Sequence, residues 1–361
     1  MARSKSSLTQ VLLSWYSQNG RQLPWRKTKD PYAIWISEIM LQQTRAEVVI
    51  PYYERFLQAF PTVQALAQAP LDTVLRLWEG LGYYSRARNL HRAAKHIVRH
   101  GGTFPRDAKE WKELPGIGPY TAAALAAIVN GQDAIALDAN LLRVGARLFG
   151  ERGIVTSPVV RKRIERRFLE LLPPGKAGTF NQALMDLGAT VCLPRNPQCE
   201  ACPLRRFCVA QATGQQEKIP VRARRRVRPH KQFIAAVLQD ERGRLLLVRQ
   251  ADRGIWGGLW TLPYVEARSW REARPKLEAI TGTRMKRTAG RSPYSITHTF
   301  THFTATYTAI PAIPTTRVRH GRWVRPEQPN LAVPVPHRKL LQAFSRGGFG
   351  AIPHARTPSN P

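Results

Sequence analysis

Four cysteines constrain the fold of this chain more than any other feature, because all of them fall within one short segment. They are Cys192, Cys199, Cys202 and Cys208, with the spacing C-x6-C-x2-C-x5-C. The N-terminus lacks the pattern of a signal peptide, so we expect a cytoplasmic protein, in which disulfides are rare. The clustering of all four cysteines argues against chance burial of single thiols. Four thiolates can bind zinc or an iron–sulfur cluster, and the spacing differs from the paired C-x2-C units of a typical zinc finger.

The charge of the chain is strongly positive. Among 361 residues, 56 Lys and Arg stand against 24 Asp and Glu, a formal net charge of +32. Such an excess favours a polyanion as partner, and on this ground DNA, RNA and an anionic membrane surface all remain open. The longest apolar run, residues 121–129, is far shorter than the roughly 18–20 residues that a membrane helix needs.

The periodicity of apolar residues divides the chain into two regions. Residues 1–212 have a helical pattern punctuated by Gly and Pro, and residues 213–230 form a basic linker, either a plain tether or a segment along a phosphate backbone. From Gln232 the period shifts toward two, as in an α+β domain. We expect helices over 31–44, 46–59, 62–68, 71–79, 85–100, 107–113, 119–129, 268–280 and 336–345, a β-hairpin from 233–239 and 244–250, and one long strand over 295–310.

The segment LPGIGPYTA, residues 114–122, has the pattern of a helix–hairpin–helix motif. Glycine at 116 and 118 lets the backbone approach a ligand closely, and the amides that open the next helix favour an anion. Such a hairpin holds a DNA phosphate without reading the base sequence. A simple Pro-Gly turn between two helices is the alternative, which the charge and the cysteine segment disfavour.

Two carboxylates are candidates for catalysis. Glu38, Gln42 and Arg45 follow a helical spacing and would form one polar stripe, on which a glutamate is usually just solvated. Asp138 stands immediately before a helical pattern, where an aspartate is usually an N-cap. Neither residue alone would indicate an enzyme.

Several motifs together resemble the adenine DNA glycosylase (MutY) family. The resemblance is dense over residues 8–210, weakens in the linker and returns over 232–345. It rests on LPWR (23–26), PYAIWISEIMLQQT (31–44), GLGYYSRARNLH (80–91), LPGIGPYT (114–121), LDAN (137–140), FNQALMDLGATVC (180–192) and the cysteine segment. The cysteine spacing itself resembles the [4Fe–4S] loop of endonuclease III-type glycosylases.

The resemblance implies a multidomain fold. It places an all-α helix–hairpin–helix glycosylase domain at 1–212, with a six-helix barrel module at about 22–135 and a cluster module at about 1–21 and 136–212. The basic linker at 213–230 leads to a nudix-like (MutT-like) α+β domain at 231–346, carried by RGIWGGLWTLP (253–263) and HTFTHF (298–303). Residues 347–361 are expected to be a disordered tail.

The same resemblance implies the chemistry of the first domain. Enzymes of this family excise adenine mispaired with 8-oxoguanine or guanine after flipping it out of the duplex. Glu38 would be the general acid that protonates adenine N7, and Asp138 would stabilise the oxocarbenium-like sugar. Tyr120 would hydrogen-bond Glu38, and Asn140 would orient Asp138. Bifunctional relatives carry a Lys at the position of Tyr120, so its absence implies a monofunctional glycosylase.

Further positions are expected to contact DNA. The resemblance assigns backbone contacts to Gly116 and Gly118, entry into the duplex beside the lesion to Gln42 and Gln43, a wedge between bases to Tyr83, and a further DNA contact to Arg86. The four cysteines would hold the [4Fe–4S] cluster. Ala139 stands where the family commonly has glycine.

The second domain is expected to read the lesion rather than to hydrolyse nucleotides. Residues 266–282 do not supply the clustered acids of a working nudix box. Phe300, Thr301 and His302 match a Phe-Ser-His loop that reads 8-oxoguanine in the family, with Thr in place of Ser. We expect a monomer that binds double-stranded DNA, is associated with the nucleoid and has no membrane partner. The alternatives are a bifunctional pyrimidine glycosylase and a non-catalytic DNA-binding redox sensor.

Overall fold

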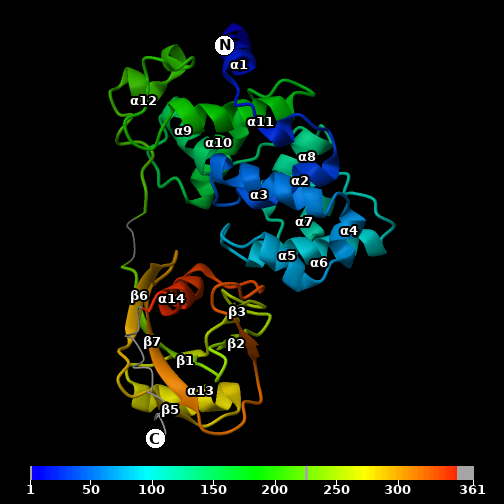
Figure 1. Ribbon diagram of the computed structural model, residues 1–361. Helices are drawn as coiled ribbons and strands as arrows, with labels where there is room; N and C mark the ends of the chain where they lie inside the picture. Colours follow the sequence, from blue (N-terminus) through cyan, green and yellow to red (C-terminus); the bar gives the residue numbers. More distant parts are fainter. Residues whose placement is uncertain (1, 224–226, 348–361) are drawn as a thin grey trace, which may run out of the picture. The chain divides into compact units, whose positions relative to one another are not determined.

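The computed structural model describes residues 2–223 and 227–347 and divides the chain into two compact units. The first unit contains Met1–Ala69 and Arg88–Arg225, and the second contains Pro70–Ala87 and Arg226–Pro361. Helices build the first unit, whereas the second contains all eight described strands together with α5, α13 and α14 (Figure 1). Residues 224–226 of the expected linker and 348–361 of the expected tail lie outside the described residues.

Helices form at almost all of the positions that the sequence predicts. In chain order they are α1 Ala2–Asn19, the 3-10 turn η1 Pro24–Arg26, α2 Pro31–Leu41, α3 Ala46–Ala59, α4 Val63–Gln68, α5 Leu71–Leu77, α6 Ser85–Arg99, α7 Ala108–Glu113, α8 Pro119–Val129, α9 Ala139–Phe149, α10 Pro158–Leu169, α11 Ala177–Asp186, the short turns η2 Leu187–Val191 and η3 Arg205–Phe207, and α12 Val209–Ala212. None of the described helices is long and apolar enough to cross a membrane.

The helix expected over 31–44 is shorter than predicted. It ends at Leu41, because Gln42 leaves helical geometry and Gln43 has a left-handed φ of 58°. Arg45 therefore stands outside this helix, as the residue before α3. The polar stripe of Glu38, Gln42 and Arg45 does not form on one helix, and that prediction was wrong.

Helix α9 shows how local sequence fixes the position of a candidate residue. The Asp138 side chain accepts a hydrogen bond from the Leu141 amide at 2.7 Å and so caps the helix. Gly150 ends the helix in left-handed geometry, with a φ of 67°. Ala139 is the first helical residue, a position whose backbone conformation does not require glycine. Buried apolar side chains of α1, α9, α10 and α11 form the core beneath it.

Two sheets form the centre of the second unit. The strands are β1 His230–Leu238, β2 Leu245–Arg249, β3 Trp260–Thr261, β4 Tyr264–Glu266, β5 Met285–Arg287, β6 Tyr294–Thr299, β7 Thr304–Pro314 and β8 Arg322–Val324. The larger sheet has the order β4-β1-β7-β5 with β6 paired to β7, and the smaller has the order β3-β2-β8. Helices α13 Trp270–Thr281 and α14 Val335–Ser345 lie on opposite sides of the larger sheet (Figure 1).

Two strand predictions need correction. The turn after β1 forms, but β1 pairs in parallel with β7, while β2 pairs with β3 and β8, so only one isolated bridge remains of the expected hairpin. The long strand over 295–310 is instead a hairpin of β6 and β7. Its turn is closed by a hydrogen bond from the Phe300 amide to the Phe303 carbonyl at 2.8 Å. Alternation continues through both arms, so the sequence pattern alone does not reveal the reversal.

Candidate active site

One cavity in the first unit gathers most of the predicted site residues. It has a volume of about 1200 Å³ and lies among η1, α2, α8, α9 and α11. From the predicted set, its walls include Glu38, Gln42, Gln43, Gly116, Gly118, Tyr120, Asp138 and Asn140. The residues come from segments far apart in sequence, and the fold brings them together in one cavity.

Glu38 is a buried carboxyl group on an apolar helix. Its neighbours in α2, from Tyr32 to Met40, are all buried, and Glu38 itself is only 6% exposed. Burial, and after it the nearby charge of Asp138, raise the pKa of Glu38, and Arg26 lowers it, so that the pKa is about 7. A carboxyl group with a pKa near neutrality can hold and release a proton at physiological pH.

Asp138 is both a helix cap and part of the cavity wall, so its role as a cap does not exclude a role in the cavity. Besides capping α9, its Oδ2 accepts a hydrogen bond from the Asn140 side chain at 3.1 Å. The pKa of Asp138 is raised on balance, because burial outweighs the hydrogen bonds from Leu141 and Asn140 and the charge of Arg143, which lower it. These donors favour the ionised form, so the two carboxyl groups of the cavity have different environments.

Tyr120 faces the same cavity from the first turn of α8. Burial raises the pKa of Tyr120 well above its ordinary value, and the charges of Glu38 and Asp138 add to this rise. No hydrogen bond joins Tyr120 to Glu38 within the part of the chain that the structure describes. The hydrogen bond expected between Tyr120 and Glu38 therefore stays a prediction.

The predicted hairpin joins α7 to α8 at one edge of the cavity. Gly116 has a left-handed φ of 83°, and a Cβ atom there would lie 2.6 Å from the Asn89 Cβ. Gly118 occupies the position before α8, and Pro119 opens the helix. Glycine at 116 is thus required by both conformation and space, and the turn keeps the shape that the motif predicts.

The two glutamines at the end of α2 lie at the same edge. The Gln42 side-chain amide donates to the Thr121 hydroxyl at 3.0 Å. Gln43 adopts left-handed geometry, which is uncommon for a residue other than glycine and concentrates at functional sites. This strain, which sequence reasoning did not find, supports the choice of Gln43 as a functional position.

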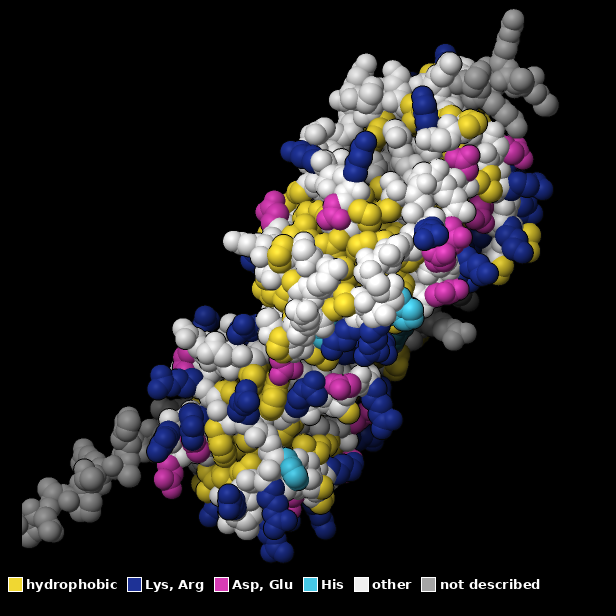
Figure 2. All heavy atoms as spheres, turned by 90° about the vertical axis from the view of Figure 1, so that its right-hand side faces the viewer, with side chains coloured by type: hydrophobic (Ala, Val, Ile, Leu, Met, Phe, Trp, Pro, Cys, Tyr) yellow, Lys and Arg dark blue, Asp and Glu magenta, His cyan; other side chains and the backbone are white. Residues whose placement is uncertain are grey.

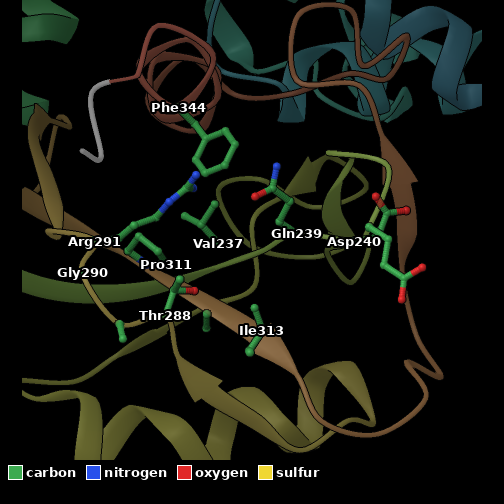
Figure 3. Close-up of a pocket in the computed structure, with 12 residues that line it drawn as sticks. Val237, Gln239, Asp240, Thr288, Gly290, Arg291, Pro311, Ile313 and Phe344 are labelled. Atoms are coloured by element: carbon green, nitrogen blue, oxygen red, sulfur yellow. The ribbon is translucent and has the colours of Figure 1, made fainter. Parts of the chain in front are cut away.

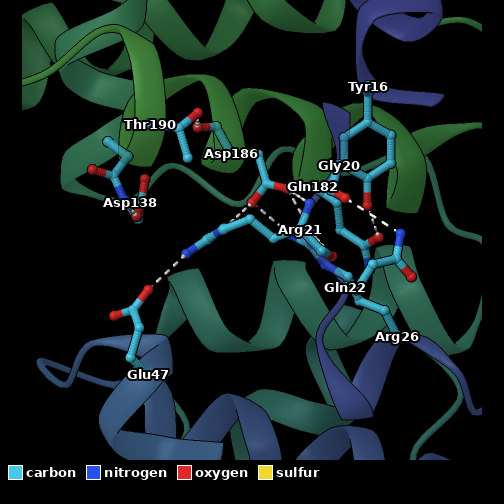
Figure 4. A network of polar contacts seen from close by, with 11 residues as sticks. Tyr16, Gly20, Arg21, Gln22, Arg26, Glu47, Asp138, Gln182, Asp186 and Thr190 are labelled. Carbon is cyan, nitrogen blue, oxygen red and sulfur yellow. Dashed lines mark hydrogen bonds and ion pairs between the residues drawn. The ribbon is translucent and has the colours of Figure 1, made fainter. Parts of the chain in front are cut away.

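A buried ion-pair network lies in the cavity wall, and sequence reasoning missed it (Figure 4). Arg21 and Arg26 line the cavity, and both bind the fully buried Asp186 at the end of α11. Gln182 also lines it and accepts a hydrogen bond from Tyr16 at 2.8 Å. No local pattern marks these residues, because more than 160 positions separate Arg21 from Asp186.

Tyr83 and Arg86 belong to the second unit. Tyr83 is 45% exposed, has a left-handed φ of 48°, and its hydroxyl lies 3.0 Å from the Thr301 hydroxyl of the same unit. Arg86 is only 6% exposed and donates to the carbonyls of Leu81 and Gly82 at 3.2 and 3.1 Å. Arg86 therefore holds the loop that presents Tyr83 instead of offering its charge at the surface.

The predicted reading loop is the turn between β6 and β7. Phe300 and Phe303 stack with ring centroids 4.6 Å apart, and Thr301 and His302 are exposed between them. The acids of the region that would carry a nudix box are engaged elsewhere. Glu266 pairs with Lys231 at 2.8 Å, and Glu272 pairs with Lys276 at 3.1 Å.

A separate cavity of about 270 Å³ in the second unit contains none of the predicted residues (Figure 3). Val237, Pro311 and Ile313 form its apolar floor, and Arg291 lies over the Phe344 ring at one side. Asp240 on its other side is already bound to Arg244 at 2.8 Å. Lys and Arg side chains are spread over the visible face of both units (Figure 2).

The four cysteines form a coupled set at the surface of the first core. None of the four forms a disulfide, and all are of intermediate exposure. Burial, and after it the charges of the other three cysteines, raise the pKa of Cys202 to about 12. Arg147 donates to the Cys192 sulfur at 3.3 Å. No three described His, Cys, Asp or Glu side chains are gathered closely enough for one metal ion. The fit to a four-iron cluster rests on the donor set, because four cysteine thiolates are the ligands that such a cluster takes.

A chain of hydrogen bonds joins this cysteine set to the cavity. Arg143 donates to the Cys192 carbonyl at 2.8 Å and to the Asn140 side-chain oxygen at 2.8 Å. Asn140 in turn donates to Asp138. The cysteine loop therefore positions a catalytic candidate through two intermediate side chains.

Comparison with known families matches each part of this arrangement. A model described as HhH-GPD superfamily base excision DNA repair protein matches residues 36–174, the iron–sulfur binding domain of endonuclease III matches 192–208, and a NUDIX domain matches 234–343. The fold and the cavity thus define a DNA N-glycosylase of base excision repair, a hydrolase with a NUDIX-like second domain. Its four cysteines bind the [4Fe–4S] cluster.

The chain belongs to the adenine DNA glycosylase family. It is 32% identical to the adenine DNA glycosylase of Buchnera aphidicola from Acyrthosiphon pisum, over 96% of this chain and 100% of that protein. It is 33% identical to the human adenine DNA glycosylase, over 92% of this chain and 73% of that protein. The family and cofactor predicted from the sequence are confirmed.

Solved structures resemble the helical part. A thermostable thymine-DNA glycosylase matches with a TM-score of 0.54 and 32% identity, over 59% of this chain and 98% of that chain. Endonuclease III in a non-covalent complex with DNA matches with a TM-score of 0.50 and 21% identity, over 58% of this chain and 95% of that chain. The second likeness concerns the fold alone.

Proposed function

We propose that this enzyme removes adenine mispaired with 8-oxoguanine, or with guanine, from double-stranded DNA. The observation that carries the proposal is the presence of Glu38 and Asp138 in one cavity, with different surroundings. Adenine in a duplex is stacked and paired, so it must leave the helix to enter such a cavity. The net charge of +32 supports binding to the phosphate backbone.

Glu38 acts as the general acid. Adenine becomes a better leaving group when its N7 is protonated, and a carboxyl group with a pKa of about 7 keeps its proton near neutral pH. As the glycosidic bond breaks, positive charge develops on the sugar. Asp138, whose ionised form is favoured by the hydrogen bonds from the Leu141 amide and the Asn140 side chain, stabilises that charge. Water completes the hydrolysis.

The enzyme is monofunctional. Strand cleavage by a bifunctional glycosylase requires an amine that forms a Schiff base with the sugar, and Tyr120 occupies the cavity position where such relatives carry lysine. We expect borohydride to trap little or no enzyme–DNA adduct. Strand breaks should appear only after alkali or heat.

Recognition of 8-oxoguanine lies with the second unit. Adenine is a normal base, so a mispair must be recognised through the opposite base. The Tyr83 hydroxyl, in the loop between α5 and α6, lies 3.0 Å from the Thr301 hydroxyl in the β6–β7 turn. Tyr83 would wedge into the duplex, and Thr301 would meet the lesion. Phe300 stacks on Phe303 within the turn, and His302 is exposed beside it. The protein acts as a monomer on nucleoid DNA.

Excision from a panel of duplexes tests this function. We expect adenine release opposite 8-oxoguanine, slower release opposite guanine, and none of a thymine glycol base. Efficient removal of thymine glycol with Schiff-base trapping would instead identify a bifunctional pyrimidine glycosylase. Tight binding without any base release would identify a non-catalytic DNA-binding protein.

A further inference from the structure

Asp186 is a buried carboxylate that binds two positively charged side chains, those of Arg21 and Arg26. Its side chain is 0% exposed. It accepts hydrogen bonds from the Arg21 amide and Nε at 2.9 and 2.7 Å, and from both terminal nitrogens of Arg26 at 2.7 and 2.9 Å (Figure 4). These bonds hold the pKa of Asp186 below its ordinary value, so it remains ionised.

Both arginines line the cavity that holds Glu38. The Arg26 guanidinium is fixed toward Asp186 by its two bonds and toward the Arg21 carbonyl by a third, at 3.0 Å. Arg21 also reaches Glu47 on α3 at 3.8 Å. Without Asp186, two guanidinium groups would face the cavity, with only the distant and exposed Glu47 carboxylate to offset them.

Few other charges reach Glu38. Asp138 approaches from the start of α9, Tyr120 from α8 and Arg26 from η1. Asp138 and burial favour the protonated form of Glu38, and Arg26 is the one cation among these groups that opposes it. The state of Glu38 therefore depends on how completely Arg26 is neutralised.

We propose that Asp186 is a positioning residue for the reaction: it holds Arg21 and Arg26 away from Glu38 and neutralises them. The cavity can then keep Glu38 protonated and accept a positive charge on the sugar. Two unpaired guanidinium groups would oppose both, since they favour a carboxylate and repel a developing cation. This inference rests on the proposed function and adds a tuning element from α11 to it.

Asp186→Asn tests the inference, because the amide keeps the shape and removes the charge. The readout is the pH profile of adenine excision in single turnovers with enzyme in excess. In this profile the rate falls at the pH where Glu38 loses its proton. We expect this limb of the profile to shift to lower pH by about one unit, so that the rate loss is larger at pH 8 than at pH 6. Glu151→Gln is the matched control, since Glu151 pairs with Arg163 through two bonds of 3.0 and 2.9 Å outside the cavity.

Arg26→Gln provides an independent test of opposite sign. Removing this cation should move the same limb to higher pH, and the double variant with Asp186→Asn should return toward the wild type. Melting temperature and cluster absorbance show whether each variant is folded. A rate loss in Asp186→Asn that is equal at every pH, or an Arg26→Gln limb that is unmoved or moves down, overturns the inference. Absence of the limb in the wild type would instead overturn the proposed function.

Discussion

Each unit of the molecule buries an ionisable group, and the two groups have opposite fates. Glu38 in the first unit has a pKa raised to about 7, and His337 in the second has a pKa lowered to about 3. Desolvation is the main cause of both shifts, because burial favours the neutral form of either group. The shift alone therefore does not make a catalytic residue.

The difference lies in what surrounds each group. Glu38 forms part of the wall of a large cavity with a second carboxylate. His337 is 0% exposed and is enclosed by the rings of Trp256, Tyr264 and Tyr307, at centroid distances of 5.0, 5.0 and 5.5 Å. In the proposed mechanism, access to a substrate lets the shifted pKa of Glu38 serve in catalysis in the first unit. In the second, the same physics makes a neutral core residue.

The largest expected effect is at Asp138. Asp138→Asn keeps a capping oxygen for α9 but removes the charge that faces the sugar, so excision should fall by at least about 10²–10⁴-fold. Asp107→Asn is the matched control, because Asp107 caps α7 in the same way, with a bond of 2.8 Å to the Glu110 amide. Single-turnover rates of both variants decide the point. If the excision rate fell only slightly and equally in the two variants, Asp138 would be a helix cap without a role in catalysis.

The cluster gives the next largest effect. The purified protein should be yellow-brown with about four iron atoms per chain. Cys199→Ser should lose iron and weaken DNA binding or folding, because the loop is organised around its metal. Iron analysis, absorbance and duplex binding measure this. Stoichiometric zinc without iron after anaerobic purification would contradict it.

Those two predictions concern parts of the molecule that the sequence predicted well. The positions of the helices, the turn of the helix–hairpin–helix motif and the cysteine loop follow from local patterns, and a family resemblance linked Glu38 to Asp138. The pairing of β1 with β7, and the binding of Arg21 and Arg26 to Asp186, depend on contacts across long stretches of chain. No local pattern encodes such contacts. Alternation of residues predicts a strand but not its partner.

The pH dependence of stability should differ between the units. The folded pKa of His337 is about 3, below the ordinary value of 6.5. The unfolded chain therefore binds the proton more readily, and the stability of the second unit should decrease as pH falls below about 6.5. The loss should reach about 2–3 kcal/mol by pH 4.5. Urea unfolding followed in that unit measures it.

His337→Leu should remove this part of the pH dependence, whatever its effect on stability at neutral pH. His320→Ala, at an exposed position, is the control and should leave the slope unchanged. If His337→Leu retains the full slope, His337 is not the group that titrates.

The smallest expected effect concerns lesion preference. Thr301→Ala and His302→Ala should each reduce the preference for 8-oxoguanine over guanine by at most about 1–3 kcal/mol, as for one lost hydrogen-bonding contact. A chain that ends near Gly214 should lose most of the preference and keep its cluster. The ratio of excision rates on the two duplexes is the readout. A loss that is equal on both would leave the second unit with general affinity only.

The most direct test of the central claim is excision by Glu38→Gln. The wild-type rate should fall about tenfold per pH unit above pH 7, because the acid then loses its proton. The glutamine has nearly the same size and no proton to give, so at pH 6 adenine release should be at least about 10²–10⁴-fold slower while duplex binding survives. Near-normal excision by this variant would contradict the assignment of Glu38 as the acid.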